Sequence, residues 1–293
     1  MHSFILFFIL RITHRIPMEP INSLLRTIKV FFTVCFFYLK LGFIYLARWH
    51  EPSLRKKGSY NHTIVVLGDD HALGVGDYST LTAGTGIAHK LGKELAKETS
   101  IRQSWQIFNR GEYKTSTEDW LHPADSKQKK KPELLTKLFQ DPKYLKAEIV
   151  IVMLGSYDAL QKDPSLTPQD TLRNLELICQ ALKRTGKEEK SIYLATIPTG
   201  GDDVYLTEEQ RADNLTRNRL IEEYVKKNDD GVLPGLQMDL VSNFEMKRRN
   251  LYWQDGRHFS DIGYTKMAKD WVPITRPDIV KREFALFRSD LGL

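Results

Sequence analysis

Residues 65–76 read VVLGDDHALGVG, and this stretch decides the fold. An apolar strand that ends in a tight Gly-Asp turn is typical of α/β enzymes, whose sites form at the carboxyl ends of parallel strands. We therefore expect the turn Gly68-Asp69-Asp70 to lie at a functional site. Near the other end of the chain, Asp255 stands three residues before His258 in an Asp-Gly-Arg-His motif.

Apolar runs and amphipathic helices alternate along the chain. Residues 149–154 (IVIVML) are continuously apolar, as a strand covered on both faces must be. This alternation predicts a three-layer α/β/α fold around a five-stranded, parallel, flavodoxin-like sheet. The predicted strands are Thr63–Leu67, Gln103–Phe108, Ile149–Leu154, Ser191–Ile197 and Leu236–Val241.

Spacing and capping patterns predict the helices. Apolar side chains share one face over residues 87–95. Thr167 followed by Pro168 is typical of a helix start, and Thr207 with Gln210 forms a capping-box pattern. The last helix is predicted to begin near Ser260.

Composition indicates one large domain with an extension. The chain has 293 residues, 41% of them hydrophobic, and a net charge of +6. Nine basic and two acidic residues lie within 1–57, so the positive charge belongs to the N-terminus and does not indicate a nucleic-acid partner. Cys35 and Cys179 are not expected to form a disulfide. No Cys/His cluster has metal-ligand spacing, so we predict neither a metal nor a cofactor.

Residues 28–47 read IKVFFTVCFFYLKLGFIYLA, about as long as the roughly 20 residues that cross a bilayer. Lys40 lies deep in this run and weighs against a span. We favour a single-pass signal anchor in a membrane of the secretory pathway, with the lipid bilayer as its partner. An interfacial amphipathic anchor and a mitochondrial presequence are the alternatives. The predicted organisation is an anchor segment 1–50, a polar linker 51–61 and a domain 62–293.

Two short patterns match glycosylation sequons, at Asn61-His62-Thr63 and Asn214-Leu215-Thr216. If they are used, the domain lies in the secretory lumen. Chance occurrence is the alternative, because so short a pattern is common.

Acyl transfer by a serine enzyme needs a nucleophile, a base, a group that orients the base, and donors that face the developing oxyanion. The chain resembles the SGNH (GDSL) hydrolases, which supply these groups in four sequence blocks. The resemblance covers about residues 63–271, and it implies the SGNH fold and an activity of carboxylic ester or acyl hydrolysis. The blocks stand in the family's order: Gly68-Asp69-Asp70, the run 109–114, Gly155-Ser156-Tyr157-Asp158, and Asp255-Gly256-Arg257-His258.

The departures from the family's pattern fall where the chemistry lies. Asp70 stands where the family has its serine nucleophile. Lys114 aligns with the oxyanion glycine, although Gly111 is an alternative match, and Tyr157 replaces an asparagine. Only the orienting acid and the base match in full, at Asp255 and His258.

An aspartate cannot replace the serine in its usual chemistry. At neutral pH Asp70 is already a carboxylate with no proton to give, and its charge repels an oxyanion. Between Asp70 and Asp255, the imidazole of His258 is expected to stay protonated. We therefore favour a membrane-anchored protein that has lost serine-esterase catalysis and acts by binding or scaffolding, with a small ester, acyl or glycan ligand.

Two alternatives stay open. In the first, the protein is an active hydrolase: Asp70 attacks an alkyl carbon and His258 then activates water, or Asp70 and His258 activate water directly. In the second, the alignment is wrong and a different serine is the nucleophile, with Ser79 and Ser104 nearest in sequence.

Other polar residues near the turn have simpler roles. Asp69 is expected to bond the backbone of the turn. His71 is expected at the surface, with a position lining the mouth of the site as the alternative. A metal cluster of Asp69, Asp70, His71 and Asp77 is disfavoured, because acids in turns usually serve the turn itself.

Overall fold

The computed structural model describes most of the chain. The described residues are 20–47, 53–54, 61–77, 86–122, 124–126, 134–160, 165–186, 190–199, 206–227, 231–239, 244, 248–253 and 255–290.

The described strands form one sheet in the order β1-β3-β2-β4-β5-β6. Strands β2 to β6 are parallel, as predicted, and the two-residue β1 adds an antiparallel edge next to β3. The first strand therefore lies within the predicted linker 51–61. The bounds are β1 Ser53–Leu54, β2 Asn61–Gly68, β3 Ser104–Gly111, β4 Ile149–Met153, β5 Ser191–Leu194 and β6 Val232–Pro234.

The last strand was predicted in the wrong place. Strand β6 ends at Pro234, whereas the prediction began at Leu236. Leu236 and Met238 are buried as expected, but their backbone continues as an extended segment tied to Thr196. A buried extended segment has the same apolar pattern as a strand, so the sequence did not separate the two.

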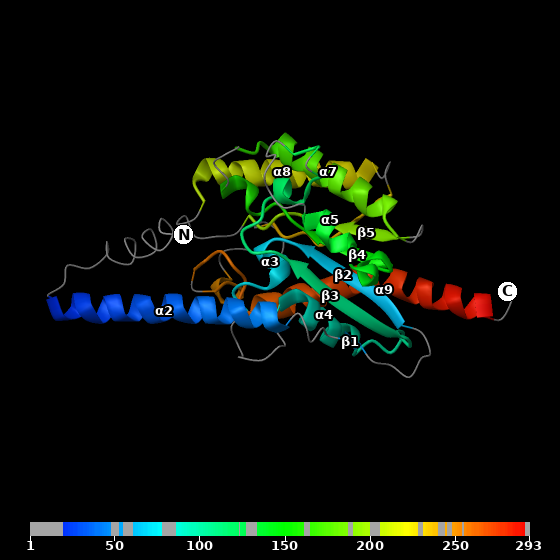
Figure 1. Cartoon of the computed structure of the whole chain (residues 1–293), viewed down its shortest axis with the longest axis horizontal. Coiled ribbons are helices and arrows are strands. Elements are labelled where there is room, and N and C mark those ends of the chain that lie inside the picture. The colour runs from blue at the N-terminus through cyan, green and yellow to red at the C-terminus, as the bar shows by residue number, and fades with distance from the viewer. Residues whose placement is uncertain are drawn as a thin grey trace.

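Helices cover both faces of the sheet (Figure 1). Ile64 and Val66 of β2 pack on the side of α4 and α9, whereas Val65 and Leu67 pack on the side of α5, α7 and α8. This alternation produces the predicted three layers. The helices are α2 Pro20–Ala47, α3 Asp70–Leu73, α4 Gly86–Leu95, α5 Leu134–Phe139, α6 Pro142–Leu145, α7 Pro168–Arg184, α8 Glu208–Lys227 and α9 Asp261–Asp290, with 3-10 turns η1 Thr117–Trp120, η2 Asp158–Leu160 and η3 Arg249–Leu251.

The predicted helix starts are present. Thr167 caps α7 in a reciprocal capping box with Asp170. Thr207 and Gln210 exchange the same pair of hydrogen bonds at the start of α8. Helix α9 begins one residue after Ser260 and runs for 30 residues.

Helix α2 has two different halves. Its N-terminal half projects beyond the body of the molecule (Figure 1). Its C-terminal half packs on the domain, where Leu41 and Ile44 form a buried cluster with Leu73 and Val75. Over the described residues, the segment Leu25–Leu46 of this helix is long and apolar enough to cross a membrane.

The two sequons lie in different surroundings. Asn61 is exposed at the start of β2. Asn214 is buried within α8, at 1% exposure, and its side-chain oxygen accepts a hydrogen bond from Arg217. A glycan on Asn214 is therefore incompatible with the folded domain.

Candidate active site

The site begins at the turn between β2 and α3. Gly68 has φ +151°, and a Cβ there would lie 1.7 Å from the carbonyl oxygen of Met153, so only glycine fits. Asp69 then caps α3: its carboxylate accepts the N–H of His71 at 3.0 Å and that of Ser156 at 2.9 Å. Asp69 has the turn role that the sequence predicted, and it also binds the end of β4 to the turn.

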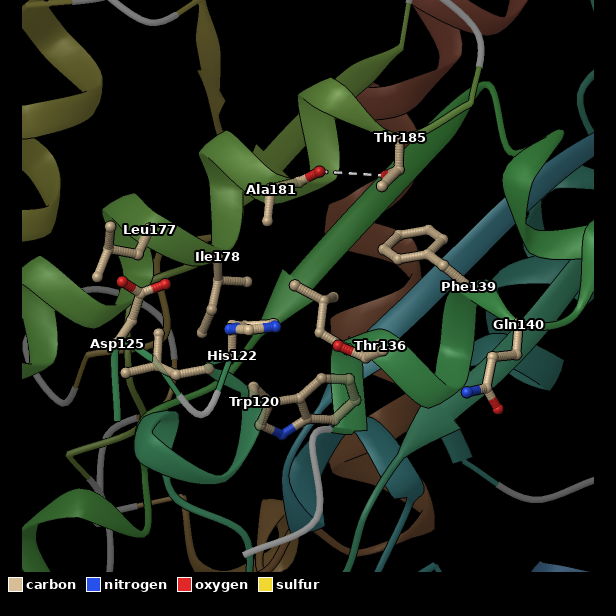
Figure 2. A pocket seen from close by; sticks show the side chains of 12 residues that line it. Trp120, His122, Asp125, Thr136, Phe139, Gln140, Leu177, Ile178, Ala181 and Thr185 are labelled. Atoms are coloured by element: carbon tan, nitrogen blue, oxygen red, sulfur yellow. Dashed lines mark hydrogen bonds between the residues drawn. The ribbon is translucent and has the colours of Figure 1, made fainter. Parts of the chain in front are cut away.

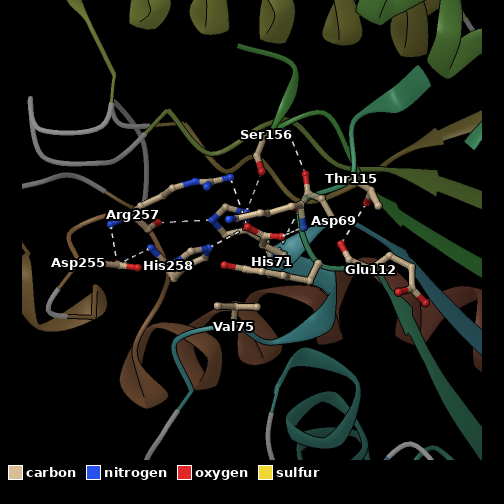
Figure 3. Close-up of polar contacts among 12 residues, drawn as sticks. Asp69, His71, Val75, Glu112, Thr115, Ser156, Asp255, Arg257 and His258 are labelled. Atoms are coloured by element: carbon tan, nitrogen blue, oxygen red, sulfur yellow. Dashed lines mark hydrogen bonds and ion pairs between the residues drawn. The ribbon is translucent and has the colours of Figure 1, made fainter. Parts of the chain in front are cut away.

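The structure brings together the two acids and the histidine that the sequence singled out; Figure 3 shows Asp255 beside His258. His258 Nε2 lies 3.0 Å from Asp70 Oδ2, and His258 Nδ1 lies 2.5 Å from Asp255 Oδ2. The other oxygen of Asp255 accepts the backbone N–H groups of Arg257 and His258. Asp70 is fully buried and the side chain of His258 is 7% exposed. The imidazole is thus held between two carboxylates.

Charge stabilises this arrangement. Burial alone would lower the pKa of His258, but the carboxylate of Asp255 and hydrogen bonds to both acids raise it to about 9. Burial would raise the pKa of Asp70, yet the hydrogen bond from His258, the charges of Arg257 and His258 and the N–H of Lys114 hold it well below its usual range. At neutral pH the group is therefore a carboxylate, an imidazolium and a second carboxylate.

Lys114 contributes its backbone to the site. Its N–H donates to Asp70 Oδ1 at 2.5 Å, and its φ of 57° lies in the left-handed region that favours glycine. This lysine therefore keeps a conformation suited to the glycine that the resemblance implies. Gly111, the alternative match, does not face the site: its N–H donates to Asn109, and a Cβ on it would lie 2.0 Å from the backbone nitrogen of Leu73. Its role is close packing between β3 and α3.

Arg257 is a site residue that sequence reasoning missed. Its Nη2 lies 3.5 Å from Asp70 Oδ2, and this buried nitrogen has no hydrogen-bond acceptor among the described residues. The guanidinium also lies 5.6 Å from the ring centre of the half-buried Tyr157. Tyr157 therefore packs against Arg257 beside the acid–histidine cluster. A charged residue inside the Asp-x-x-His motif was the available signal.

His71 is buried, at 2% exposure, and the prediction of a surface position was wrong. The first turn of α3 packs beneath the loop that carries Arg257, which places the ring inside the site. Nε2 lies 3.4 Å from the carbonyl oxygen of Arg257, and Nδ1 lies 3.1 Å from Ser156 Oγ. A carbonyl only accepts, so the ring donates to it from Nε2.

Ser156 and His71 do not form a second catalytic set. Asp69 also approaches Nδ1 of His71, at 3.4 Å, on the same nitrogen as the serine. In a serine triad the acid and the serine bind opposite ring nitrogens. Of the serines weighed from sequence, Ser104 opens β3 at the far end from Gly111, and Ser79 lies outside the described residues.

The remaining acids near the site have structural partners. Asp158 accepts three hydrogen bonds from Thr117 and Thr171, and burial raises its pKa to about 6. Asp77 accepts the N–H of Gly86 and lies 3.4 Å from Lys90. Within the described ranges, no three His, Cys, Asp or Glu side chains are placed to hold a metal ion.

A cavity of about 390 Å³ lies between η1, α5 and α7 (Figure 2). Its lining is mainly apolar and includes Trp120, Leu135, Phe139 and Ile178. Neither Asp70 nor His258 lines it. The cavity is therefore separate from the acid–histidine cluster.

Similarity to solved structures identifies the fold. The acetylxylan esterase of Geobacillus stearothermophilus matches with a TM-score of 0.53 and 17% identity, over 75% of this chain and 95% of that chain. The lipase/acylhydrolase of Enterococcus faecalis gives 0.52 and 18%, over 74% and 96%. The aryl esterase of M. smegmatis gives 0.52 and 15%, over 74% and 99%. This chain has the SGNH hydrolase fold.

The likeness of this SGNH-fold chain to those enzymes lies in the fold alone, because the sequences are so distant. No family model and no curated protein matches the sequence. In the Geobacillus esterase, a variant with one serine changed to alanine is a catalytic mutant. The resemblance in motifs aligns Asp70 with the nucleophile serine of such enzymes, so the chemistry has to be argued from this chain's own side chains.

Proposed function

We propose that this protein is a membrane-anchored member of the SGNH fold that lacks serine-esterase chemistry and acts by binding a small ester, acyl or glycan ligand. One observation carries the proposal. The Asp70 carboxylate takes the N–H of Lys114 on one oxygen and Nε2 of His258 on the other. These two N–H groups are therefore bound to the carboxylate and are not available to an ester substrate.

The arrangement opposes acyl transfer at each step. A serine enzyme needs a neutral histidine to accept a proton, whereas His258 is protonated and already paired with Asp70. The N–H of Lys114, which would face the oxyanion, faces a carboxylate instead. Loss of one oxyanion donor alone costs about 10²–10³ in turnover.

Arg257 supports a binding role. Its buried Nη2 lies beside Asp70 without a hydrogen-bond acceptor in the described part of the chain. The ion pair with Asp70 offsets part of the charge, but a buried donor that makes no hydrogen bond costs about 1–3 kcal/mol. A carbonyl or hydroxyl oxygen of an ester, acyl or glycan ligand would supply the missing acceptor.

Helix α2 supports the membrane anchor. Large apolar side chains on its outer face are 56–65% exposed, which is unfavourable in water over so long a stripe. They are Leu25, Phe31, Phe32, Leu39 and Leu46. We infer a signal anchor in the secretory pathway, with a mitochondrial location as the alternative; the exposed Asn61 leaves one sequon accessible.

A fluorophosphonate probe tests the loss of serine chemistry. The purified full chain should stay unlabelled under conditions that label a known serine hydrolase to completion. Labelling that disappears in His258→Ala would contradict the proposal, because it would reveal a working serine paired with that histidine.

A second function is favoured by the same contacts. Asp70 Oδ1 accepts the N–H of Lys114 and Oδ2 accepts that of His258, so a remaining lone pair of Oδ2 would attack an alkyl carbon, breaking the bond from that carbon to its leaving group. The ester formed would remove the charge of Asp70, so the pKa of His258 would fall and the imidazolium would give its proton to the departing group. The neutral imidazole would then accept a proton from water. Hydroxide attack at Cγ of Asp70 then releases an alcohol and restores the carboxylate.

Oxygen-18 water separates this route from direct water activation. A single turnover that places the label in Asp70 supports the covalent route. Label in the product alone supports Asp70 and His258 acting together on water, and no turnover of any alkyl or acyl ester supports the binding role.

A further inference from the structure

Three consecutive N–H groups after β3 bind three different elements. The N–H of Glu112 donates to the carbonyl of Gly68 at 2.8 Å, at the end of β2. The N–H of Tyr113 donates to the hydroxyl of Tyr45 on α2 at 3.3 Å, and that of Lys114 donates to Asp70 on α3. The segment 112–114 is therefore fixed from three sides, and α2 supplies one of them.

Tyr45 makes two bonds to this segment. Besides accepting the N–H of Tyr113, its hydroxyl donates to Glu112 Oε2 at 3.1 Å. Phe37, two turns earlier on the same face of α2, packs on the ring of Tyr113 with ring centres 5.8 Å apart. The docked half of α2 thus holds both the backbone and the side chains that precede Lys114.

Lys114 needs this support because its backbone is strained. A non-glycine residue in the left-handed region costs about 1–2 kcal/mol and persists where its surroundings determine it. Its N–H, which donates to Asp70, belongs to the peptide that follows Tyr113, and the N–H of Tyr113 is held by Tyr45. The hydrogen bond from Tyr113 to Tyr45 fixes the preceding peptide. It therefore affects the direction of the Lys114 N–H, which is the oxyanion-type donor of the site.

We propose that Tyr45 is a positioning residue of the site, through which the helix that anchors the protein also sets the direction of the Lys114 N–H. The membrane part of this statement rests on the proposed function. The inner face of α2 contacts the site segment, and its outer face carries the exposed apolar side chains that fit a lipid bilayer. Membrane anchoring and site geometry then share one rigid helix.

Tyr45→Phe tests the proposal in the full chain, reconstituted in phospholipid nanodiscs with lysine backbone amides labelled with nitrogen-15. It removes the hydroxyl and keeps the packing. The amide of Lys114 should exchange about 3- to 10-fold faster, as expected for loss of one hydrogen bond. Its proton resonance should move upfield as the bond to the carboxylate lengthens, which loss of general stability alone would not produce.

Tyr38→Phe is the matched control, since Tyr38 lies on the same helix and is 41% exposed. It should leave the Lys114 signals unchanged. Unaltered Lys114 signals in Tyr45→Phe, or equal changes in both variants, overturn the positioning role. Flotation of the same samples with lipid reports on the anchor separately, and its failure overturns only the membrane part.

Discussion

Asp70 reverses the proton arrangement that the fold uses with a serine. A serine hydroxyl gives its proton to the histidine, whereas here the histidine donates to the carboxylate. Complete burial would make an isolated carboxylate very unfavourable, so the cluster is stable only because His258, Arg257 and the N–H of Lys114 surround it. The same contacts that stabilise the charge remove the site from serine chemistry.

Asp70→Ser alone should restore little esterase activity. The N–H of Lys114 still faces the side chain of residue 70, but Tyr157 packs on Arg257 and supplies no oxyanion donor at that position. We expect short-chain p-nitrophenyl ester hydrolysis at least about 100-fold below that of Asp70→Ser combined with Tyr157→Asn. Adding His258→Ala should abolish the activity of either variant. A large gain from the single change would mean that the pocket is otherwise intact.

His258 should make stability depend on pH in a defined direction. Its pKa is about 9 in the folded protein against 6.5 for the unperturbed group, so the folded state binds an extra proton between these values. The contribution of His258 to the free energy of unfolding is fully present below pH 6.5 and is lost as the pH rises to about 9. The loss is at most about 3 kcal/mol.

Chemical denaturation at a series of pH values measures this effect. The difference between the wild type and His258→Gln isolates the contribution of the histidine from that of other titrating groups. A difference that stays constant between pH 6.5 and 9 would mean that the imidazole is not the proton-binding group.

At the scale of the elements, the sequence pattern predicted the strands and helices whose burial or capping requires particular residue types. Strand β4 was recognised because a strand covered on two sides is continuously apolar, and α7 because Thr167 and Pro168 begin it. The motifs placed Asp70 and His258 together, since strand ends and the C-terminal block meet in this fold. Arg257 and Tyr45 were missed, and the surface was favoured for His71, because their roles come from contacts between distant segments, which leave no local pattern.

Glu283 holds α9 against the sheet, and its removal should lower the free energy of unfolding. It is 8% exposed and accepts the N–H groups of Arg102 and Gln103 and the indole N–H of Trp105. Glu283→Ala leaves these buried donors unpaired, so we expect a loss of about 2–4 kcal/mol in the free energy of unfolding. Asp270→Ala, which breaks a more exposed pair with Lys266 on the same helix, should cost less than about 1 kcal/mol. Equal losses in urea denaturation would contradict this account of α9.

At the scale of the whole molecule, the anchor is not a simple tether. Hydropathy predicted the helix but not its docking, and Lys40, which weighed against a membrane span, is 2% exposed and interacts electrostatically with Asp77. With Phe37 to Tyr45 docked, the described helical residues before Phe37, 20–36, span about 25 Å, less than the roughly 30 Å of a bilayer core. The domain surface beside α2 is therefore expected to lie at the level of the lipid headgroups.

Membrane binding should depend on the outer face of α2 and not on exposed apolar residues elsewhere. Phe32 and Leu39 are 65% and 56% exposed on this helix, and Leu215 is 45% exposed on α8. Phe32→Asp with Leu39→Asp places one charge at membrane depth, at a cost of about 2.5–3.5 kcal/mol, and a second charge beside the lipid headgroups, while leaving the docked face unchanged. In flotation with phospholipid vesicles, the double variant should stay in the soluble fraction, whereas the wild type and Leu215→Asp should float. If the double variant floats like the wild type, the outer face of α2 does not hold the protein on the bilayer.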